Sequence, residues 1–237
     1  MYAADHDLAR PSSSLLARLP RFTPAEQRLG LALYRLLARG APVTHGELAA
    51  ALDLPTTRVA ELLAGEGLRA MVYQDDGRVV GFGGLALAPM HHTFEVDGRV
   101  LYTWCAWDSL FIPEMLAQPA RVASNCPVSG DTIRLVVTPN GVTESSHGSP
   151  VVSLLVPEAL EGDVRRTMAT FCHFVFFFAS RAAGDEWTQR HRGTFLVSLE
   201  HAFALGQRKN ALQFAETLAR EGHSSAGVDS PRARTEL

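Results

Sequence analysis

Hydrophobic positions in the first third of the chain follow a helical period. Two capping boxes, which begin at Thr23 and Thr44, each precede apolar residues spaced three or four apart. A short turn at residues 54–57 leads into a third segment with the same period. The pattern therefore predicts three helices with helix-turn-helix character over residues 21–67.

Beyond residue 70 the pattern changes to β-rich runs separated by turn residues. Turn signals rich in Asp, Asn, Gly and Pro occur at 75–77, 97–98, 127–131 and 140–141. The first of them predicts a hairpin that would add a wing to the helical unit. The runs expected to form mainly antiparallel strands are 71–73, 78–82, 91–96, 99–104, 120–125, 132–138 and 151–156.

Helical patterns return between and after these strands, which predicts an α+β fold. The expected helices are 106–116, 158–168 and 196–220. We expect small antiparallel sheets with helices to form a core, on which the N-terminal winged-helix-like unit packs. The predicted organisation is a flexible arm at 1–20, a helical winged-helix-like domain at 21–80, an α+β core carrying the chemistry at 81–220, and a disordered tail at 221–237.

Composition narrows the classes of protein that this chain can belong to. The 237 residues are 46% hydrophobic, yet no apolar run reaches the length of a membrane span and no secretory h-region occurs. We therefore expect a cytoplasmic protein with no membrane partner. The net charge of −3 gives no general attraction to nucleic acid, and no Gly-rich phosphate motif lies between a strand and a helix.

The helix-turn-helix pattern raises the question of DNA binding. Its candidate recognition helix, residues 56–64, offers Arg58 against Glu61, which provides too few contacts to phosphate. A packing role for the unit is the better interpretation, so no nucleic-acid partner is expected.

The three cysteines are an odd number and lie far apart, which favours reduced thiols. Cys105 is expected near a helix N-terminus, where the helix dipole favours a nucleophilic thiolate. Asp108, three residues later, would share its face and could pass a proton. The alternative is a buried inert thiol beside an acid that merely starts a helix.

The other two cysteines have different surroundings. Cys172 lies in the apolar run 170–180, which we expect to be a buried strand with Cys172 and His173 on opposite faces. His173 would then be a satisfied, half-buried histidine, and Cys172 could be only a small hydrophobic residue of the core. Cys126 precedes Pro127 in a turn without a charged partner, which indicates a structural role.

The spacing of these residues argues against zinc. There is no C-x-x-C pair and no H-E-x-x-H motif, and no papain-like context surrounds any cysteine, although His191 and His201 remain available. Two separated cysteines and one carboxylate suit a thiophilic ion, since thiolates bind soft metals while a carboxylate carries protons.

Over about residues 20–210 the chain resembles the bacterial alkylmercury (organomercurial) lyases. The resemblance is carried by short motifs in the order of that family. They are Tyr102–Asp108, Ala120–Cys126, Phe171–His173, Phe177–Ser180, Glu186, Trp187, His191 and Val197–Gln207.

The resemblance implies a winged-helix-like unit on an α+β core, and a role for each of four residues. Cys105 would be the nucleophilic, mercury-binding cysteine, Asp108 the proton-handling acid, and Cys172 the second mercury-binding cysteine; Cys126 would be structural. The implied reaction is protonolysis of a carbon–mercury bond to give a hydrocarbon and Hg(II), as part of mercury detoxification. The Hg(II) product would be held transiently by Cys105, Cys172 and Asp108.

No organic cofactor is implied by this resemblance. The implied partners are an organomercurial substrate and, for the Hg(II) product, a mercuric reductase or small external thiols. Two positions depart from the family pattern: His173 stands where some members have a cysteine, and Trp107 where a smaller aliphatic residue is common. The second departure is expected to reshape the pocket.

A second function is also compatible with the sequence. A thiol-based, metal-responsive DNA-binding sensor would use the helix-turn-helix unit to bind DNA and the three cysteines to bind the ion. The weak recognition helix counts against this alternative.

Overall fold

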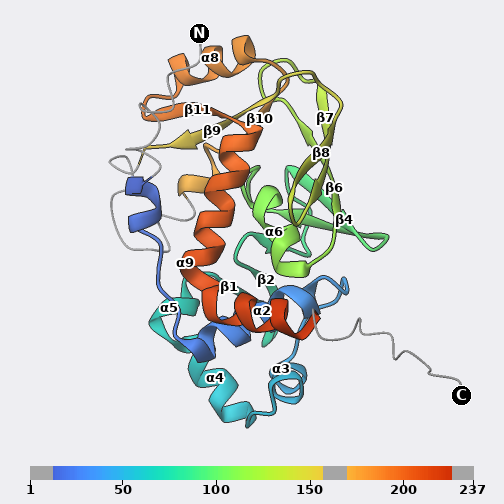
Figure 1. Cartoon of the computed structure of the whole chain (residues 1–237), viewed down its shortest axis with the longest axis vertical. Coiled ribbons are helices and arrows are strands. Elements are labelled where there is room, and N and C mark those ends of the chain that lie inside the picture. Colours follow the sequence, from blue (N-terminus) through green and yellow to red (C-terminus); the bar gives the residue numbers. More distant parts are fainter. Residues whose placement is uncertain (1–12, 157–169, 226–237) are drawn as a thin grey trace, which may run out of the picture.

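The computed structural model describes residues 13–156 and 170–225 of the chain (Figure 1). It has mixed helices and antiparallel sheets, so the predicted α+β class is confirmed. The helix expected at 158–168 lies outside the described residues. Within the described ranges, every helix is too short or too polar to cross a membrane.

Two of the three predicted N-terminal helices form at the capping boxes, and the third forms after the short turn at 54–57. They are α2 (Pro24–Leu37), α3 (His45–Leu52) and α4 (Thr56–Ala64), followed by the short α5 (Glu66–Arg69). At the start of α2, the Thr23 N–H donates to Glu26 Oε2 at 2.8 Å, and Thr23 Oγ1 accepts from the Glu26 N–H at 3.4 Å. These local signals are sufficient to predict where α2 and α3 begin, because each capping box satisfies backbone N–H donors that the first helical turn leaves unpaired.

Part of the expected flexible arm is ordered. Residues 13–17 are helical, and the side chains of Leu15 and Leu16 are buried in the main core. Burial of these two leucines fixes the segment, which its polar neighbours alone did not indicate.

The larger sheet is antiparallel throughout and has the strand order β1-β2-β3-β5-β4-β6-β7-β8. Asp97 and Gly98 have positive φ angles in the turn between β4 and β5, as the Asp-Gly signal predicted. The strands are β1 (Val72–Asp75), β2 (Arg78–Phe82), β3 (Leu85–Ala86), β4 (His92–Val96), β5 (Arg99–Thr103), β6 (Ala120–Asn125), β7 (Thr132–Thr138) and β8 (Gly141–Ser145).

This sheet is larger than the small sheets that we expected, because the β1–β2 hairpin joins it. Gly81 of β2 pairs with Ala86 of β3, so the hairpin expected as a wing continues into the core. The boundary expected between residues 80 and 81 consequently falls inside β2. Helices 21–67 and the strands that follow share one hydrophobic core.

A second, three-stranded sheet has the order β10-β9-β11. Its strands are β9 (Val151–Leu155), β10 (Phe177–Phe178) and β11 (Thr194–Ser198). Three helices complete the described core: α6 (Asp108–Leu116), α8 (Arg181–Arg190) and α9 (Leu199–Ser225). The long α9 runs from the small sheet to α2 and packs beside α6 (Figure 1), so it connects the two ends of the molecule.

Three sequence-based expectations are corrected here. The helix expected at 106–116 begins only at Asp108, and it runs through Pro113 to Leu116; the proline ring removes one backbone donor, and the buried helix tolerates this loss. Residues 194–198, partly assigned to the last helix, form β11, and that helix extends to Ser225, into the expected tail. The run 170–180 is not one strand: only Phe177 and Phe178 pair, and a helical turn precedes them.

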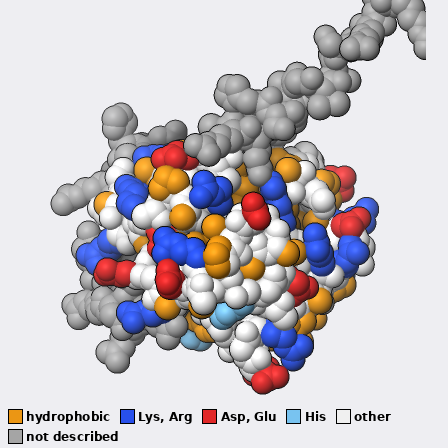
Figure 2. Space-filling model, turned by 90° about the horizontal axis from the view of Figure 1, so that it is seen from below, with side chains coloured by type: hydrophobic (Ala, Val, Ile, Leu, Met, Phe, Trp, Pro, Cys, Tyr) orange, Lys and Arg blue, Asp and Glu red, His pale blue; other side chains and the backbone are white. Residues whose placement is uncertain are grey.

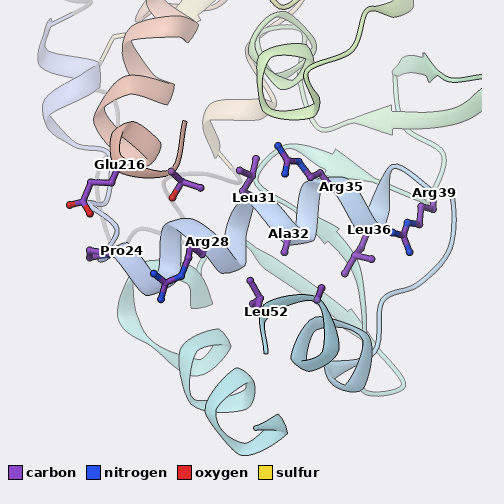
Figure 3. A pocket seen from close by; sticks show the side chains of 11 residues that line it. Pro24, Arg28, Leu31, Ala32, Arg35, Leu36, Arg39, Leu52 and Glu216 are labelled. Atoms are coloured by element: carbon purple, nitrogen blue, oxygen red, sulfur yellow. The ribbon is translucent and has the colours of Figure 1, made fainter. Parts of the chain in front are cut away.

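The face below α2, α3 and α4 carries basic, acidic and apolar side chains mixed together (Figure 2). On α4, Arg58 is paired with Glu61 at 2.8 Å. Arg28 and Arg35 lie instead on α2, and Arg39 lies just after its end, around a pocket of about 390 Å³ with an apolar floor (Figure 3). The candidate recognition helix thus has no free basic row with which to follow a phosphate backbone.

We predict that Thr23→Ala lowers the free energy of unfolding by about 1 kcal/mol, because it removes the N-cap acceptor of α2. Urea unfolding followed by circular dichroism measures the change. Thr56→Ala is the matched control: Thr56 is exposed at the start of α4 and does not cap it, so a change within about 0.5 kcal/mol is expected. Equal losses in both variants would contradict the capping role.

Candidate active site

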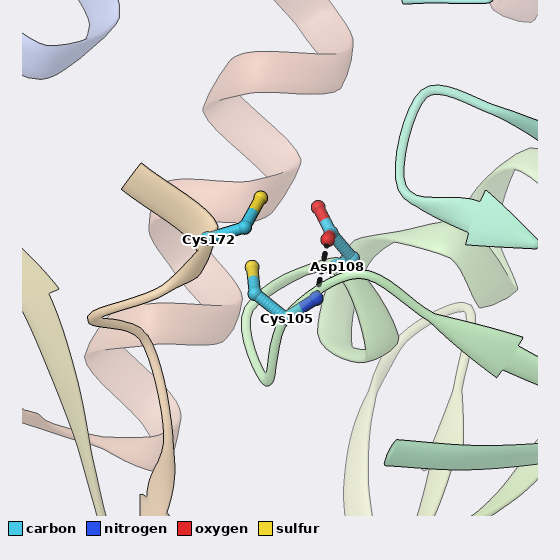
Figure 4. Close-up of side chains that lie close together, drawn as sticks. All are labelled: Cys105, Asp108 and Cys172. Carbon is cyan, nitrogen blue, oxygen red and sulfur yellow. Dashed lines mark hydrogen bonds between the residues drawn. The ribbon is translucent and has the colours of Figure 1, made fainter. Parts of the chain in front are cut away.

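Cys105, Asp108 and Cys172 come together in the folded chain. Cys105 follows the end of β5, Asp108 is the first residue of α6, and Cys172 ends the helical segment 170–172 that precedes β10. The two sulfur atoms and a carboxylate oxygen all lie within 4.8 Å of one another. Figure 4 shows their side chains gathered in one space from two separate segments. Among the described residues, this is the one group of His, Cys, Asp and Glu whose arrangement could hold a metal ion.

Local hydrogen bonds fix the turn that carries Cys105 and Asp108. The Cys105 N–H donates to Asp108 Oδ2 at 2.9 Å, and Thr103 Oγ1 donates to the Cys105 carbonyl at 3.1 Å. The Asp108 carboxyl group, on the first residue of α6, therefore accepts a hydrogen bond from the backbone three residues earlier. This contact holds the acid beside the Cys105 sulfur.

Longer-range hydrogen bonds hold the segment that carries Cys172. The Ala106 N–H donates to the Val175 carbonyl at 3.2 Å, which ties this segment to the turn at Cys105. Ser153 Oγ in β9 donates to the Phe174 carbonyl at 2.6 Å and accepts from the Phe176 N–H at 3.0 Å. Cys172 is thus positioned by both the small sheet and the Cys105 turn.

Gly84 approaches the acid so closely that no side chain fits there. A Cβ atom at this position would lie 2.5 Å from Asp108 Cγ, and its φ of +103° also favours glycine. The Trp104 N–H donates to the Gly84 carbonyl at 2.8 Å. The loop between β2 and β3 therefore closes over the carboxyl group.

Burial dominates the electrostatics of the thiols. Cys105 is fully buried, and this burial raises the pKa of its thiol well above the usual range, helped by Cys172 and the Asp108 carboxylate. A hydrogen bond with Cys105 lowers the pKa of the Cys172 thiol, but burial and Asp108 outweigh it and raise that pKa. Without substrate, both sulfurs are therefore thiols rather than thiolates at neutral pH.

Burial also raises the pKa of Asp108 to about 6, against the opposing effects of the Cys105 hydrogen bonds and the Lys209 charge. At pH 7 this carboxyl group is mostly a carboxylate, and about a tenth of it carries a proton. A group with a pKa so near neutrality can both accept and donate a proton during one reaction.

Sequence reasoning missed Lys209, whose positive charge acts on the Asp108 carboxyl group. Lys209 is buried, its Nζ lies 3.8 Å from the Phe111 ring centroid, and it donates to Asn210 Oδ1 at 3.3 Å. Burial lowers its pKa to about 7, although Asp108 and Glu114 act to raise it. One signal was present: Lys209 falls on the α9 stripe of Ala202, Leu205 and Gln213, all buried.

The remaining candidates lie outside this cluster. Cys126 is buried, and its sulfur accepts from the Ser129 N–H at 3.5 Å. Burial opposes the Cys126 thiolate, but hydrogen bonds from Ser129 outweigh this effect and lower the pKa. His173 is exposed rather than half-buried, because it lies in a turn that follows the helical residue Cys172 and not in a strand. His191 ends α8 and stacks on Trp187, with ring centroids 3.6 Å apart.

Trp107, a departure from the pattern of the resembling family, packs away from the solvent. Its Nε1–H donates to the Ala202 carbonyl at 2.9 Å, and its ring contacts those of Phe111 and Phe171 edge-on. Trp107 therefore joins α6 to α9 beneath the cluster.

The chain is similar to known proteins of one family. A family profile described as MerB, alkylmercury lyase, matches residues 85–209, a range that contains all three clustered residues. The alkylmercury lyase of Pseudomonas putida is 41% identical over 75% of this chain and 81% of its own. That of Streptomyces lividans is 39% identical over 74% and 78% of the two chains.

A solved structure, the mercury-bound form of MerB2, superposes with a TM-score of 0.65 at 25% sequence identity. The match covers 88% of this chain and all of that one. These similarities support a lyase rather than the DNA-binding alternative. The profile spans more than half of the 237 residues, and the relatives exceed 30% identity over about three quarters of the chain, so the protein belongs to the alkylmercury lyase family.

Proposed function

We propose that this protein is an organomercurial lyase in which Cys105, Cys172 and Asp108 cleave the carbon–mercury bond. The observation that carries the proposal is the gathering of two sulfurs and one carboxylate oxygen within 4.8 Å in a member of this family. Reduced thiols are required for the reaction, so we place the protein in the cytoplasm. The direct test is to incubate it with phenylmercury and excess thiol and to measure benzene.

In the first step, one thiol binds the organomercurial cation. Mercury displaces the thiol proton, and the resulting thiolate is a soft ligand that holds the metal. The Asp108 carboxylate, whose pKa is about 6, takes up the displaced proton. The raised pKa values of the free thiols are consistent with this order, since the thiolate forms only as mercury replaces its proton.

In the second step, the other thiol binds mercury and releases its proton to solvent. Two thiolates increase electron density on mercury and weaken its bond to carbon. The electron pair of that bond then takes the proton from Asp108, so a C–H bond replaces the C–Hg bond. One organomercurial cation and two thiols thus give a hydrocarbon, one bis-thiolate Hg(II) and one proton in solution.

Product release follows from the unequal burial of the sulfurs. Cys105 is fully buried, whereas Cys172 is partly exposed and lines a cleft. An external thiol would attack mercury from the Cys172 side and remove it by exchange. We propose small thiols or a mercuric reductase as acceptors; the proposal uses no organic cofactor.

We predict that Cys105→Ser reduces turnover to less than about a tenth of the wild-type rate, because a serine hydroxyl is neither a soft ligand nor ionised at neutral pH. Benzene release from phenylmercury, measured by gas chromatography, provides the rate. A variant that retains more than this fraction would remove Cys105 from the nucleophile role.

Asp108→Asn should retain organomercury binding but release hydrocarbon about 10² to 10⁴ times more slowly. The amide can still accept from the Cys105 N–H, but it cannot carry the proton to carbon. Stoichiometric binding and single-turnover release are measured on one preparation. Binding and release that both match the wild type would show that Asp108 only starts a helix.

Cys126→Ala tests the structural assignment of the third cysteine. Removing this buried sulfur should lower the free energy of unfolding by about 1 kcal/mol and leave turnover within about twofold. Thermal melting and the benzene assay are run together. A variant with unchanged melting that no longer turns over would place Cys126 in the chemistry.

A further inference from the structure

A cleft of about 550 Å³ opens beside the cluster, and the Cys172 side chain forms part of its wall. The cleft lies between β1, the loop before β4, and the segment that precedes β10. Its other lining residues include Tyr73, Met90, His91, Trp104 and Phe176. Four separate parts of the sequence thus meet at this opening.

Most of the wall is aromatic and partly open to solvent. Tyr73 and Trp104 pack edge to face with ring centroids 4.8 Å apart, and the rings of His91 and Phe176 lie 6.0 Å apart. Tyr73 is 50% exposed and Met90 43% exposed, although both are large apolar residues. Apolar side chains that stay exposed around one concave site are typical of a ligand-binding surface.

The position of the cleft indicates which part of a substrate it would receive. With mercury between the two sulfurs, the attached carbon has to lie near Asp108, while the rest of the organic group needs space. Cys105 is fully buried in the core and Asp108 is 5% exposed, so little room remains on their side. The side of Cys172 is open to the cleft, as its part in the cleft wall shows.

We propose that this cleft binds the organic substituent of the mercurial and that its aromatic wall selects aryl groups over small alkyl groups. The inference rests on the proposed lyase function and adds the class of substrate. A flat ring can pack edge-on or face-on against Tyr73, Trp104 and Phe176, whereas a methyl group has no ring edge or face to offer them. Tyr73 would therefore be a specificity-determining residue for aryl substrates.

The experiment measures kcat/KM for phenylmercury and methylmercury in the wild type, Tyr73→Ala and Tyr73→Phe. Intrinsic reactivities differ between the two substrates, but they cancel when the phenyl-to-methyl ratio is compared between variants. Loss of one aromatic contact should lower this ratio about two- to tenfold in Tyr73→Ala. The ratio should stay at the wild-type value in Tyr73→Phe, which keeps the ring.

Val100→Ala is the matched control for removing an exposed apolar side chain. Val100 is 58% exposed on β5, four residues before Trp104, and it lines a different cleft. Its phenyl-to-methyl ratio should equal that of the wild type. Tyr73 is half exposed at the edge strand β1, so its truncation leaves the core intact, and thermal melting verifies this.

The outcomes separate the two proposals. If the wild type releases neither benzene nor methane, the lyase function itself fails and the substrate inference falls with it. If both hydrocarbons are released but Tyr73→Ala keeps the wild-type ratio, the lyase function stands and the aryl-selecting cleft is wrong. An equal fall in both rates would likewise overturn selection, since it would indicate general damage to the site.

Discussion

The hydrogen bond from the Cys105 N–H to Asp108 Oδ2 is the contact on which the rest of the site depends. It joins the residues that follow β5 to the first turn of α6. The acid, three residues from the thiol in the same turn, is thereby held beside it. Gly84 leaves room for the carboxyl group, and the Ala106 hydrogen bond to Val175 brings Cys172 to the same place.

Burial then gives each of these groups its protonation state. In a poorly solvated site the charged form of an acid is disfavoured, so the pKa values of Cys105, Cys172 and Asp108 all rise. The higher pKa values leave both thiols protonated at neutral pH and bring the pKa of the Asp108 carboxyl group to about 6. In the proposed mechanism these pKa values let a proton pass from sulfur to the Asp108 oxygen when mercury binds, and from that oxygen to carbon later. The same burial lowers the pKa of Lys209, whose charge favours the Asp108 carboxylate.

The N-terminal helices also contribute to this arrangement. The β1–β2 hairpin that follows them extends the large sheet and carries Tyr73 to the cleft beside Cys172. α2 packs against α9, the helix that carries Lys209. A unit that resembles a DNA-binding module in its helix order thus contributes to a small-molecule site, while Arg58, the basic residue of α4, is paired with Glu61.

The sequence by itself determined the elements whose cause is local. The Thr23 and Thr44 capping boxes and the Asp-Gly turn at Asp97 all act within four residues, so the α2 and α3 helices and the β4–β5 hairpin appeared where expected. The Cys105 and Asp108 pairing was also accessible, since the two residues are three apart in one turn.

Only the tertiary structure decided the features that depend on distant residues. The run at 170–180 looked like a strand because apolar residues fill it, but its pairing is limited by Ser153, which binds its backbone around Phe174 and Phe176. The place of Cys172 beside Cys105, the exposure of His173 and the burial of Lys209 follow from such contacts between segments. The hydrophobic pattern of one segment does not encode these features. Propensity describes which secondary structure a segment can form, but packing between segments decides which residues it contacts.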